Sequence, residues 1–215
     1  MPFRNRADAA QRLSERLIAY KGKNPLVLAI PRGAVPMARV LADALGGELD
    51  VVLVRKLGAP MNPELAVGSV DESGWVYVAD FAASTGADTA YIESEKQRQL
   101  AVMRQRRVQY TAARAPIDPA GRIVIVVDDG LATGATMISA LHALRAKNPA
   151  KLIAAVPVSP PDTLRKVEKL ADETVCLEVP EYFMAVGQFY TEFPQVEDDE
   201  VIALLRAAPH TEQHK

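Results

Sequence analysis

Two adjacent aspartates and a short glycine-containing loop are the part of the sequence best suited to chemistry. Asp128 and Asp129 follow the apolar run 123–127, and the chain continues as Gly-Leu-Ala-Thr-Gly-Ala-Thr. Ionised carboxylates at a strand end need donors, which sugar hydroxyls or a hydrated metal ion can supply. The loop leads into a helix, so free backbone N–H groups and the hydroxyls of Thr133 and Thr136 can bind a phosphate. These features predict a site for a sugar phosphate such as ribose 5-phosphate.

Other catalytic and binding motifs fit the sequence less well. A Walker P-loop needs Lys and then Ser or Thr after the glycine, whereas Ala135 follows Gly134. A dinucleotide site needs a glycine cluster after the first strand, and the stretch 30–33 has a single glycine. A phosphatase with an aspartyl nucleophile would carry its acids at alternate positions. A zinc site is not predicted, because the candidate ligands have no ligand spacing; they are His142, His210, His214 and Cys176.

The elements that must position these residues alternate along the chain. Short apolar runs rich in β-branched residues are typical of parallel strands buried on both faces, and the segments between them have helical spacing. This alternation predicts a doubly wound, mostly parallel α/β sheet that binds ligands at the carboxyl ends of its strands. The predicted strands cover 26–30, 51–56, 123–127, 152–158 and 174–179, and the predicted helices cover about 9–18, 35–45, 91–110, 135–147, 161–170 and 197–207.

A different pattern interrupts this alternation after the second predicted strand. Two β-prone pieces within 65–78 flank the turn sequence Asp-Glu-Ser-Gly, which predicts a hairpin. Residues 79–90 are small and polar and favour a mobile loop. The charged helix that follows carries several arginines that could contact phosphates, but we interpret them as a solvated helix face without a site. They are Arg98, Arg104, Arg106 and Arg107.

Composition and charge narrow the class of protein. The 215 residues are 49% hydrophobic and 24% charged, which is enough to bury a core as one domain. The net charge of −2 offers no global field for attracting nucleic acid or an anionic membrane. The sequence has one cysteine, no signal-peptide pattern at its start and no apolar run near the ~20 residues of a membrane span. We therefore expect a cytoplasmic protein that does not enter a membrane.

The stretch IVIVVDDGLATGAT at 123–136 resembles the signature of the type I phosphoribosyltransferases, an apolar strand, two acids and a Thr-Gly-x-Thr phosphate loop. The resemblance implies that 5-phosphoribosyl diphosphate (PRPP) binds here, with Asp128 and Asp129 on the ribose hydroxyls. It implies that Gly134 lets the loop backbone approach the 5′-phosphate. The implied phosphate-binding residues are Ala132, Thr133, Gly134, Ala135 and Thr136.

The same resemblance extends to the diphosphate and to the acceptor. Pro-Arg-Gly at 31–33 stands where the family has its diphosphate-binding loop, which implies that Arg32 and Gly33 contact the diphosphate. Arg55 and Lys56 stand where the family supplies cations to it. Phe183 lies where purine-salvage relatives stack a ring on the base. The implied organisation is one domain over 1–215, with a core at about 24–160, a flexible cover at 64–90, and a hood at about 172–207 that includes the N-terminal helix.

The resemblance also has departures that bear on the acceptor. Ala132 stands where hypoxanthine-type relatives place a general-base aspartate, and Pro157 stands roughly where they have a lysine that reads the purine oxo group. Oxopurine salvage is therefore not expected, although adenine-type relatives tolerate alanine at the first position. The sequence does not identify the acceptor base.

The resemblance implies a transferase of nucleotide or nucleoside metabolism that uses PRPP and a nucleobase-like acceptor and releases diphosphate. The implied catalytic residues are Asp128, Asp129, Arg55 and Lys56. Mg²⁺ is the implied cofactor, carried by PRPP with possible help from the two aspartates rather than held by protein alone. The alternative is a non-catalytic PRPP sensor that regulates RNA, DNA or a partner enzyme. The negative net charge and the lack of a helix-turn-helix segment favour the enzyme, and a homodimer is possible.

Overall fold

A computed structural model describes residues 2–208; residue 1 and residues 209–215, which include His210 and His214, lie outside it. Its centre is a five-stranded sheet in which every neighbouring pair is parallel. The strands run in the order β2 (Glu48–Val51), β1 (Leu26–Ala29), β6 (Ile123–Val127), β7 (Lys151–Val158) and β8 (Glu173–Glu178). The predicted doubly wound parallel sheet is confirmed.

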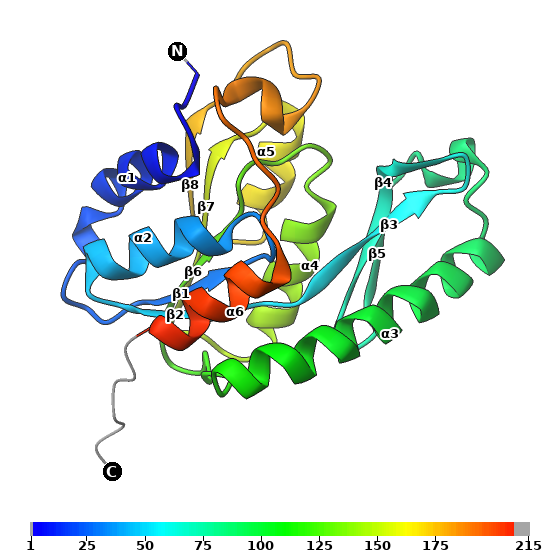
Figure 1. The fold of residues 1–215 in the computed structure, drawn as a ribbon. Coiled ribbons are helices and arrows are strands. Elements are labelled where there is room, and N and C mark those ends of the chain that lie inside the picture. Colours follow the sequence, from blue (N-terminus) through cyan, green and yellow to red (C-terminus); the bar gives the residue numbers. More distant parts are fainter. Residues whose placement is uncertain (1, 209–215) are drawn as a thin grey trace.

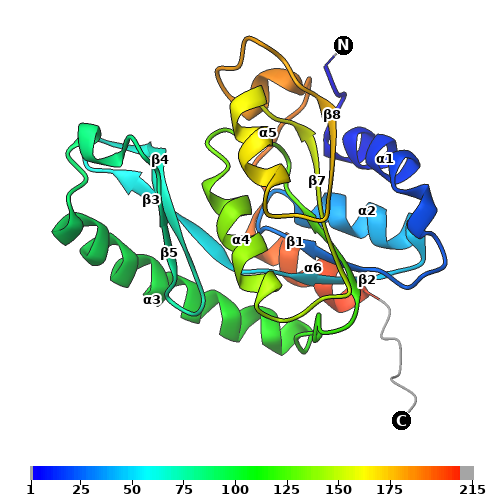
Figure 2. The ribbon, with the colours of Figure 1, turned by 180° about the vertical axis from the view of Figure 1, so that it is seen from behind.

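Helices cover both faces of this sheet (Figures 1 and 2). One face packs against α1 (Arg6–Arg16), α2 (Val35–Leu45) and α6 (Asp198–Ala207), and the other against α4 (Ala135–Arg145) and α5 (Pro161–Glu168). The core divides accordingly: Val27 and Ala29 of β1 belong to one apolar cluster, and Leu26 and Leu28 belong to the other. Alternate side chains of a strand point to opposite faces, so a strand covered on both sides must be apolar throughout.

A second, antiparallel sheet extends beside the core, with the long helix α3 (Thr89–Ala113) along it (Figure 1). Its strands are β3 (Val54–Ala59), β4 (Asn62–Asp71) and β5 (Val76–Val78). The predicted hairpin is confirmed at its turn, where the Asp71 carboxylate accepts hydrogen bonds from the backbone of Ser73 (2.8 Å) and Trp75 (3.1 Å). We call this sheet with residues 79–88 the cover; the loop contains a short 3-10 helix at Ala82–Thr85.

The prediction of one strand over 51–56 is wrong. β2 ends at Val51, and Val54 begins β3 by pairing with Asp71 in the antiparallel sheet. All of residues 51–54 are buried, so the apolar pattern does not reveal that the chain passes from one sheet to the other. The consequence is functional, because residues 55 and 56 belong to the cover and not to the central sheet.

The root of the cover is held firmly against α4. The Ser69 hydroxyl lies 2.6 Å from both the Ala135 carbonyl oxygen and the Ser139 hydroxyl, and all three residues are buried. Nearby, the Trp75 ring stacks on His142 with 3.6 Å between centroids. Residues 62–66, at the far end of β4, are exposed or half-buried. Any motion of the cover is therefore expected in its distal part.

The segment after β8 folds back over the N-terminus. The backbone N–H of Phe3 donates to the Phe189 carbonyl (2.7 Å), and the Thr191 N–H donates to the Phe3 carbonyl (2.8 Å). The short helices at Ile18–Tyr20 and Val186–Phe189 complete the helical elements of the described residues. None of the described helices has the length and apolar character needed to cross a membrane.

Candidate functional site: a phosphate loop, two aspartates and an arginine cluster

The phosphate loop lies between the carboxyl end of β6 and the first turn of α4. Gly134 is the residue before the helix, with φ of 76°, and no side chain caps this end of α4. The Ala135 N–H donates only a long hydrogen bond, of 3.5 Å, to the Thr133 hydroxyl. The first N–H groups of a helix need partners, and the positive end of its dipole favours an anion. This helix end therefore has the N–H groups and the dipole that a phosphate would require, and phosphate binding by the loop stays a prediction.

The structure gives two reasons for glycine at position 134 in addition to the expected approach of a phosphate. A Cβ at Gly134 would lie 2.6 Å from the Thr163 methyl carbon on α5. The Thr163 hydroxyl donates to the Ala132 carbonyl at 2.7 Å, so α5 supports the loop from behind. Glycine is thus required by its left-handed backbone and by the close approach of α5. Ala132 itself is exposed, Ala135 is buried and Thr136 is half-buried.

Asp128 lies between the strand end and the phosphate loop. Its carboxylate accepts the backbone N–H of Asp129 at 2.9 Å and faces the Thr136 hydroxyl at 3.5 Å. Burial, and then the charge of Asp129, raise the pKa of Asp128 well above its ordinary value. The structure thus brings a weakly satisfied carboxylate next to the helix end that can hold a phosphate.

Asp129 joins three parts of the chain that are far apart in sequence. Its Oδ2 atom accepts hydrogen bonds from Nη2 (2.8 Å) and Nε (3.0 Å) of Arg6, and its carbonyl accepts one from the Tyr190 hydroxyl (2.6 Å). A Cβ at Gly33 would lie 2.2 Å from the same Oδ2 atom, so this glycine permits the contact. Burial raises the pKa of Asp129, and the Arg6 guanidinium acts in the opposite direction.

Arg6 is a site residue that sequence reasoning missed. Its guanidinium stacks 3.8 Å from the centroid of the Phe193 ring and donates to the Pro194 carbonyl at 2.6 Å. The pair with Asp129 spans 123 residues of sequence. Before the fold is known, nothing distinguishes this arginine from the solvent-facing charges of an amphipathic helix.

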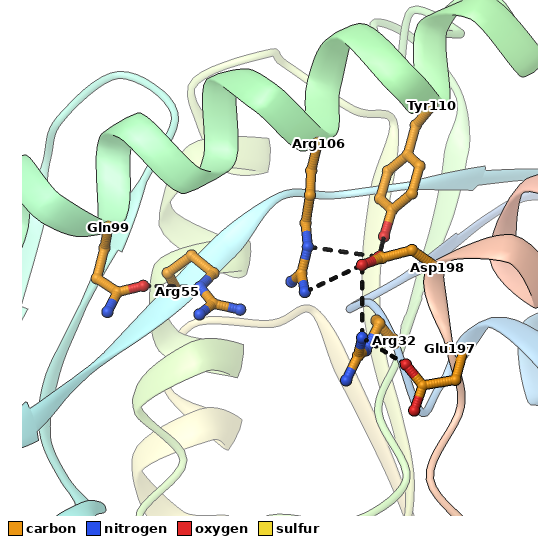
Figure 3. A network of polar contacts seen from close by, with 7 residues as sticks. All are labelled: Arg32, Arg55, Gln99, Arg106, Tyr110, Glu197 and Asp198. Atoms are coloured by element: carbon orange, nitrogen blue, oxygen red, sulfur yellow. Dashed lines mark hydrogen bonds and ion pairs between the residues drawn. The ribbon is translucent and has the colours of Figure 1, made fainter.

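The predicted diphosphate loop places Arg32 next to α6. The Pro31–Arg32 peptide bond is cis. The Arg32 guanidinium lies 3.2 Å from Glu197 and 3.4 Å from Asp198 at the start of that helix (Figure 3). Tyr110 of α3 donates to Asp198 at 2.5 Å. Burial would raise the pKa of Asp198, but this hydrogen bond and the charges of Arg106 and Arg32 hold it below its ordinary value.

Arg55 and Arg106 lie beside Arg32, so that three guanidinium groups from three elements converge (Figure 3). Arg55 of β3 donates to the Gln99 side chain at 2.8 Å, and Arg106 of α3 lies 3.4 Å from Asp198. Burial, and then the charges of Arg106, Arg32 and Arg98, lower the pKa of Arg55. The interpretation of the α3 arginines as a solvated face is therefore wrong for Arg106, whose side chain is only 16% exposed. The charge pattern of α3 does not reveal that Arg106 is half-buried, because this depends on the packing of α3 against β3 and α6.

Lys56 does not join this cluster. Its ammonium pairs instead with Glu64 at 2.8 Å, and both side chains are exposed. Consecutive strand residues point to opposite faces, so Arg55 and Lys56 cannot contact one anion from the same face of β3. Arg55 and Lys56 are neighbours in the sequence and were predicted to act together, but they lie on opposite faces of β3.

Phe183 lies in the hood, where its ring stacks against Phe189 with 5.3 Å between centroids. It is half-buried, whereas its neighbours Tyr182 and Met184 are 87% and 93% exposed. Phe183 therefore already packs against another ring.

Two further observations concern metals and cavities. Among residues 2–208, no group of three or more His, Cys, Asp or Glu side chains could hold a metal ion. A cavity of about 820 Å³ lies between the turn of the cover and α4, with Asp71, Arg107 and His142 in its wall. None of the predicted site residues lines this cavity, so the size of a cavity does not identify the candidate site in this protein.

Comparison with known proteins agrees with this geometry. The model of the phosphoribosyl transferase domain matches residues 3–193. A Mycobacterium tuberculosis (strain H37Rv) protein, provisionally named a phosphoribosyl transferase, is 42% identical over 207 residues, which is 96% of this chain and 47% of that protein. The chain thus spans about half the length of this curated relative.

One solved structure shares the fold over nearly the whole chain. The crystal structure of TT1426 from Thermus thermophilus has 44% identity and a TM-score of 0.79, covering 96% of this chain and 98% of that one. A hypoxanthine-guanine phosphoribosyltransferase from Bacillus anthracis has 15% identity and a TM-score of 0.47 over 83% of this chain and 81% of its own, which carries no inference about substrate. From the family match over residues 3–193 and the strand-end aspartates with their phosphate loop, the chain belongs to the phosphoribosyl transferase domain family.

Proposed function

We propose that this chain binds PRPP and transfers its phosphoribosyl group to a nucleobase-like acceptor, with release of diphosphate. The observation that carries the proposal is the proximity of three features at one edge of the sheet. The Asp128 carboxylate at the end of β6 lies 3.5 Å from the Thr136 hydroxyl in the uncapped first turn of α4, and an arginine cluster follows β1. These features suit ribose hydroxyls, a 5′-phosphate and a diphosphate, respectively.

In this reaction the chain positions the reactants and stabilises charge. A nitrogen of the acceptor attacks the anomeric carbon as the bond to diphosphate breaks. The electron pair leaves with the diphosphate, and the proton of the attacking N–H group passes to a diphosphate oxygen or to water. The 132–136 loop would hold the 5′-phosphate, and Asp128 would accept hydrogen bonds from the ribose. Arg32, Gly33 and Arg55 would bind the leaving group. Orientation and electrostatic complementarity of this kind are the main catalytic contributions that such a site can make.

Mg²⁺ would reach this site with the diphosphate. Asp129 already pairs with Arg6, and Asp128 already accepts a backbone N–H, so the two carboxylates are poorly placed to hold a metal on their own. When bound, Mg²⁺ neutralises charge on the leaving group. Lys56 lies on the opposite face of β3 from Arg55, and we propose for it only a role after closure of the distal cover.

The hood and cover would enclose the acceptor. Phe183, backed by Phe189, offers a flat apolar surface to a heteroaromatic ring, which supports a nucleobase-like acceptor. Closure of the distal cover would exclude water from the oxocarbenium-like transition state. A single-domain organisation, a homodimer and a cytoplasmic location remain predictions from sequence.

The deciding experiment measures diphosphate release from PRPP with Mg²⁺ and a panel of nucleobases. We expect release that depends on one class of base and on Asp128. Tight PRPP binding with no release for any base would favour a regulatory PRPP sensor. Failure to bind either PRPP or ribose 5-phosphate would contradict the proposal as a whole.

A further inference from the structure

The arginine cluster already has an internal anion. Glu197 and Asp198, at the start of α6, are the carboxylates that pair with Arg32, and Asp198 also pairs with Arg106. Arg55 lies within electrostatic reach of both other arginines, and its described hydrogen bond is to a neutral amide. Two of the three guanidinium groups, those of Arg32 and Arg106, are thus paired with the two carboxylates.

The ion pairs of Arg32 and Arg106 with the two acids are longer than strong guanidinium–carboxylate pairs. The pairs of Arg32 with Glu197 and Asp198, and of Arg106 with Asp198, measure 3.2 to 3.4 Å, whereas Arg6 and Asp129 approach to 2.8 Å. Charge-assisted hydrogen bonds between guanidinium and carboxylate are usually ~2.7–2.9 Å long. The short contact of Asp198 is with Tyr110, at 2.5 Å. Asp198 is therefore bound tightly to α3 through a phenol and loosely to the arginines.

We propose that Glu197 and Asp198 act as an internal counter-anion that the diphosphate group of the ligand displaces from Arg32 and Arg106, and that Arg106 is a diphosphate-binding residue. The proposal rests on the proposed function, because it assigns the diphosphate end of PRPP to this cluster. Diphosphate offers more acceptor oxygens to planar guanidinium groups than a pair of carboxylates does.

Displacement does not require α6 to unfold. The helix is anchored by the buried side chains of Val201 and Leu205, and Asp198 can keep its bond to Tyr110 after the arginines turn to the ligand. Glu197 is 63% exposed and can move freely into solvent. Diphosphate binding then exchanges the long ion pairs with the acids for contacts between the arginines and the diphosphate. Breaking the existing pairs opposes binding, so removal of the acids should raise the affinity for diphosphate.

The test measures binding of inorganic diphosphate with Mg²⁺ by calorimetry. Glu197→Gln and Asp198→Asn should tighten diphosphate binding by roughly two- to five-fold each, the size expected for partly exposed ion pairs. Arg106→Gln should weaken it by about ten-fold or more, as expected for loss of a hydrogen bond to a charged group. All three variants should bind ribose 5-phosphate as the parent does, because that ligand uses the 132–136 loop.

Matched controls come from the same two helices. Asp199→Asn changes the same charge in the same first turn of α6, and Arg104→Gln does so on the exposed face of α3. Both should leave diphosphate affinity unchanged, and PRPP should compete with diphosphate for one site. Equal tightening by Asp198→Asn and Asp199→Asn would reduce the effect to net charge and overturn the proposal. Weaker binding by Glu197→Gln and Asp198→Asn would show that the acids orient the arginines for the ligand, which also overturns it.

The outcomes also separate this inference from the proposed function. If the parent binds PRPP and ribose 5-phosphate but the acidic variants change nothing, only the counter-anion is rejected. If the parent binds diphosphate but neither sugar phosphate, the assignment of PRPP fails, and the cluster is a diphosphate site of another kind.

Discussion

The guanidinium of Arg6 lies 2.8 Å from the Asp129 carboxylate and connects the first residue of α1 to the strand end that carries the candidate site. The two side chains are only 11% and 17% exposed. Asp129 also lies against the loop at Gly33, where a Cβ would meet its carboxylate, and accepts a hydrogen bond from Tyr190. Asp129 and its partner Arg6 therefore hold three segments together at the end of β6.

Arg6→Gln should destabilise the protein strongly. Removal of one partner of a largely buried ion pair leaves an uncompensated charge and costs about 3–5 kcal/mol. Thermal or denaturant unfolding measures the loss. Asp129→Asn in the Arg6→Gln background should recover part of it, because the remaining charge is then removed. A simple sum of the two single effects would show that the pair is not coupled.

At neutral pH, Asp128→Asn should raise the free energy of unfolding and lower the affinity for ribose 5-phosphate. Burial and the charge of Asp129 raise the pKa of Asp128 in the folded protein, so the folded state binds the proton more tightly than the unfolded state does. The free energy of unfolding is therefore lowered at pH values above the folded-state pKa, where Asp128 is ionised in both states. This loss disappears as the pH falls below the unfolded-state pKa of ~3.9. Unfolding of the parent and the variant between pH 4 and pH 8, as a rough range, should show the difference growing with pH.

The same variant should weaken ribose 5-phosphate binding by about 1.5–3 kcal/mol, the value of a hydrogen bond to a charged group. Calorimetry at neutral pH measures this loss. A more stable variant that binds normally would mean that Asp128 does not contact the sugar.

Substitutions in the phosphate loop should show separately how its backbone and its threonine hydroxyls contribute to ribose 5-phosphate binding. Gly134→Val should abolish ribose 5-phosphate binding and also lower the melting temperature, because the residue has φ of 76° and its Cβ would meet Thr163 at 2.6 Å. A smaller substitution, Gly134→Ala, should also lower the melting temperature, because it too places a Cβ against Thr163. Thr163→Ser removes the methyl group and keeps the hydroxyl that donates to Ala132, so it should restore part of the stability that Gly134→Ala loses.

Thr133→Val and Thr136→Val should give a graded loss in ribose 5-phosphate affinity. Each removes one hydroxyl while the helix N–H groups remain, so the expected cost is roughly 1–3 kcal/mol per charged hydrogen bond. Circular dichroism should match the parent. If neither variant nor Gly134→Val changes affinity, residues 132–136 do not bind the phosphate.

Chelation of Mg²⁺ should distinguish the two ends of PRPP. The metal is expected on the diphosphate, so EDTA should weaken PRPP and diphosphate binding and leave ribose 5-phosphate binding intact. Parallel titrations with and without EDTA measure this. Equal loss for all three ligands would indicate a metal bound at the sugar-phosphate end.

Local sequence determined the parts of this protein that depend on neighbours along the chain. The uniformly apolar run 123–127 specified a buried parallel strand, since only a strand covered on both faces lacks polar alternation. The residues after it specified an acid pair followed by an uncapped helix end, which is a local arrangement of backbone groups. The turn after Asp71 was likewise readable from its residue types.

Tertiary structure alone decided which distant side chains meet. Sequence could not separate β2 from β3, because residues 51–54 are buried in either arrangement. It could not select Arg6 or Arg106 from other helix arginines, because burial of a charged side chain depends on the element that packs against it. It could not predict that Asp198 would pair with Arg32 across 166 residues. Such contacts form when α1, α3 and α6 pack around the strand ends, and no local pattern encodes that packing.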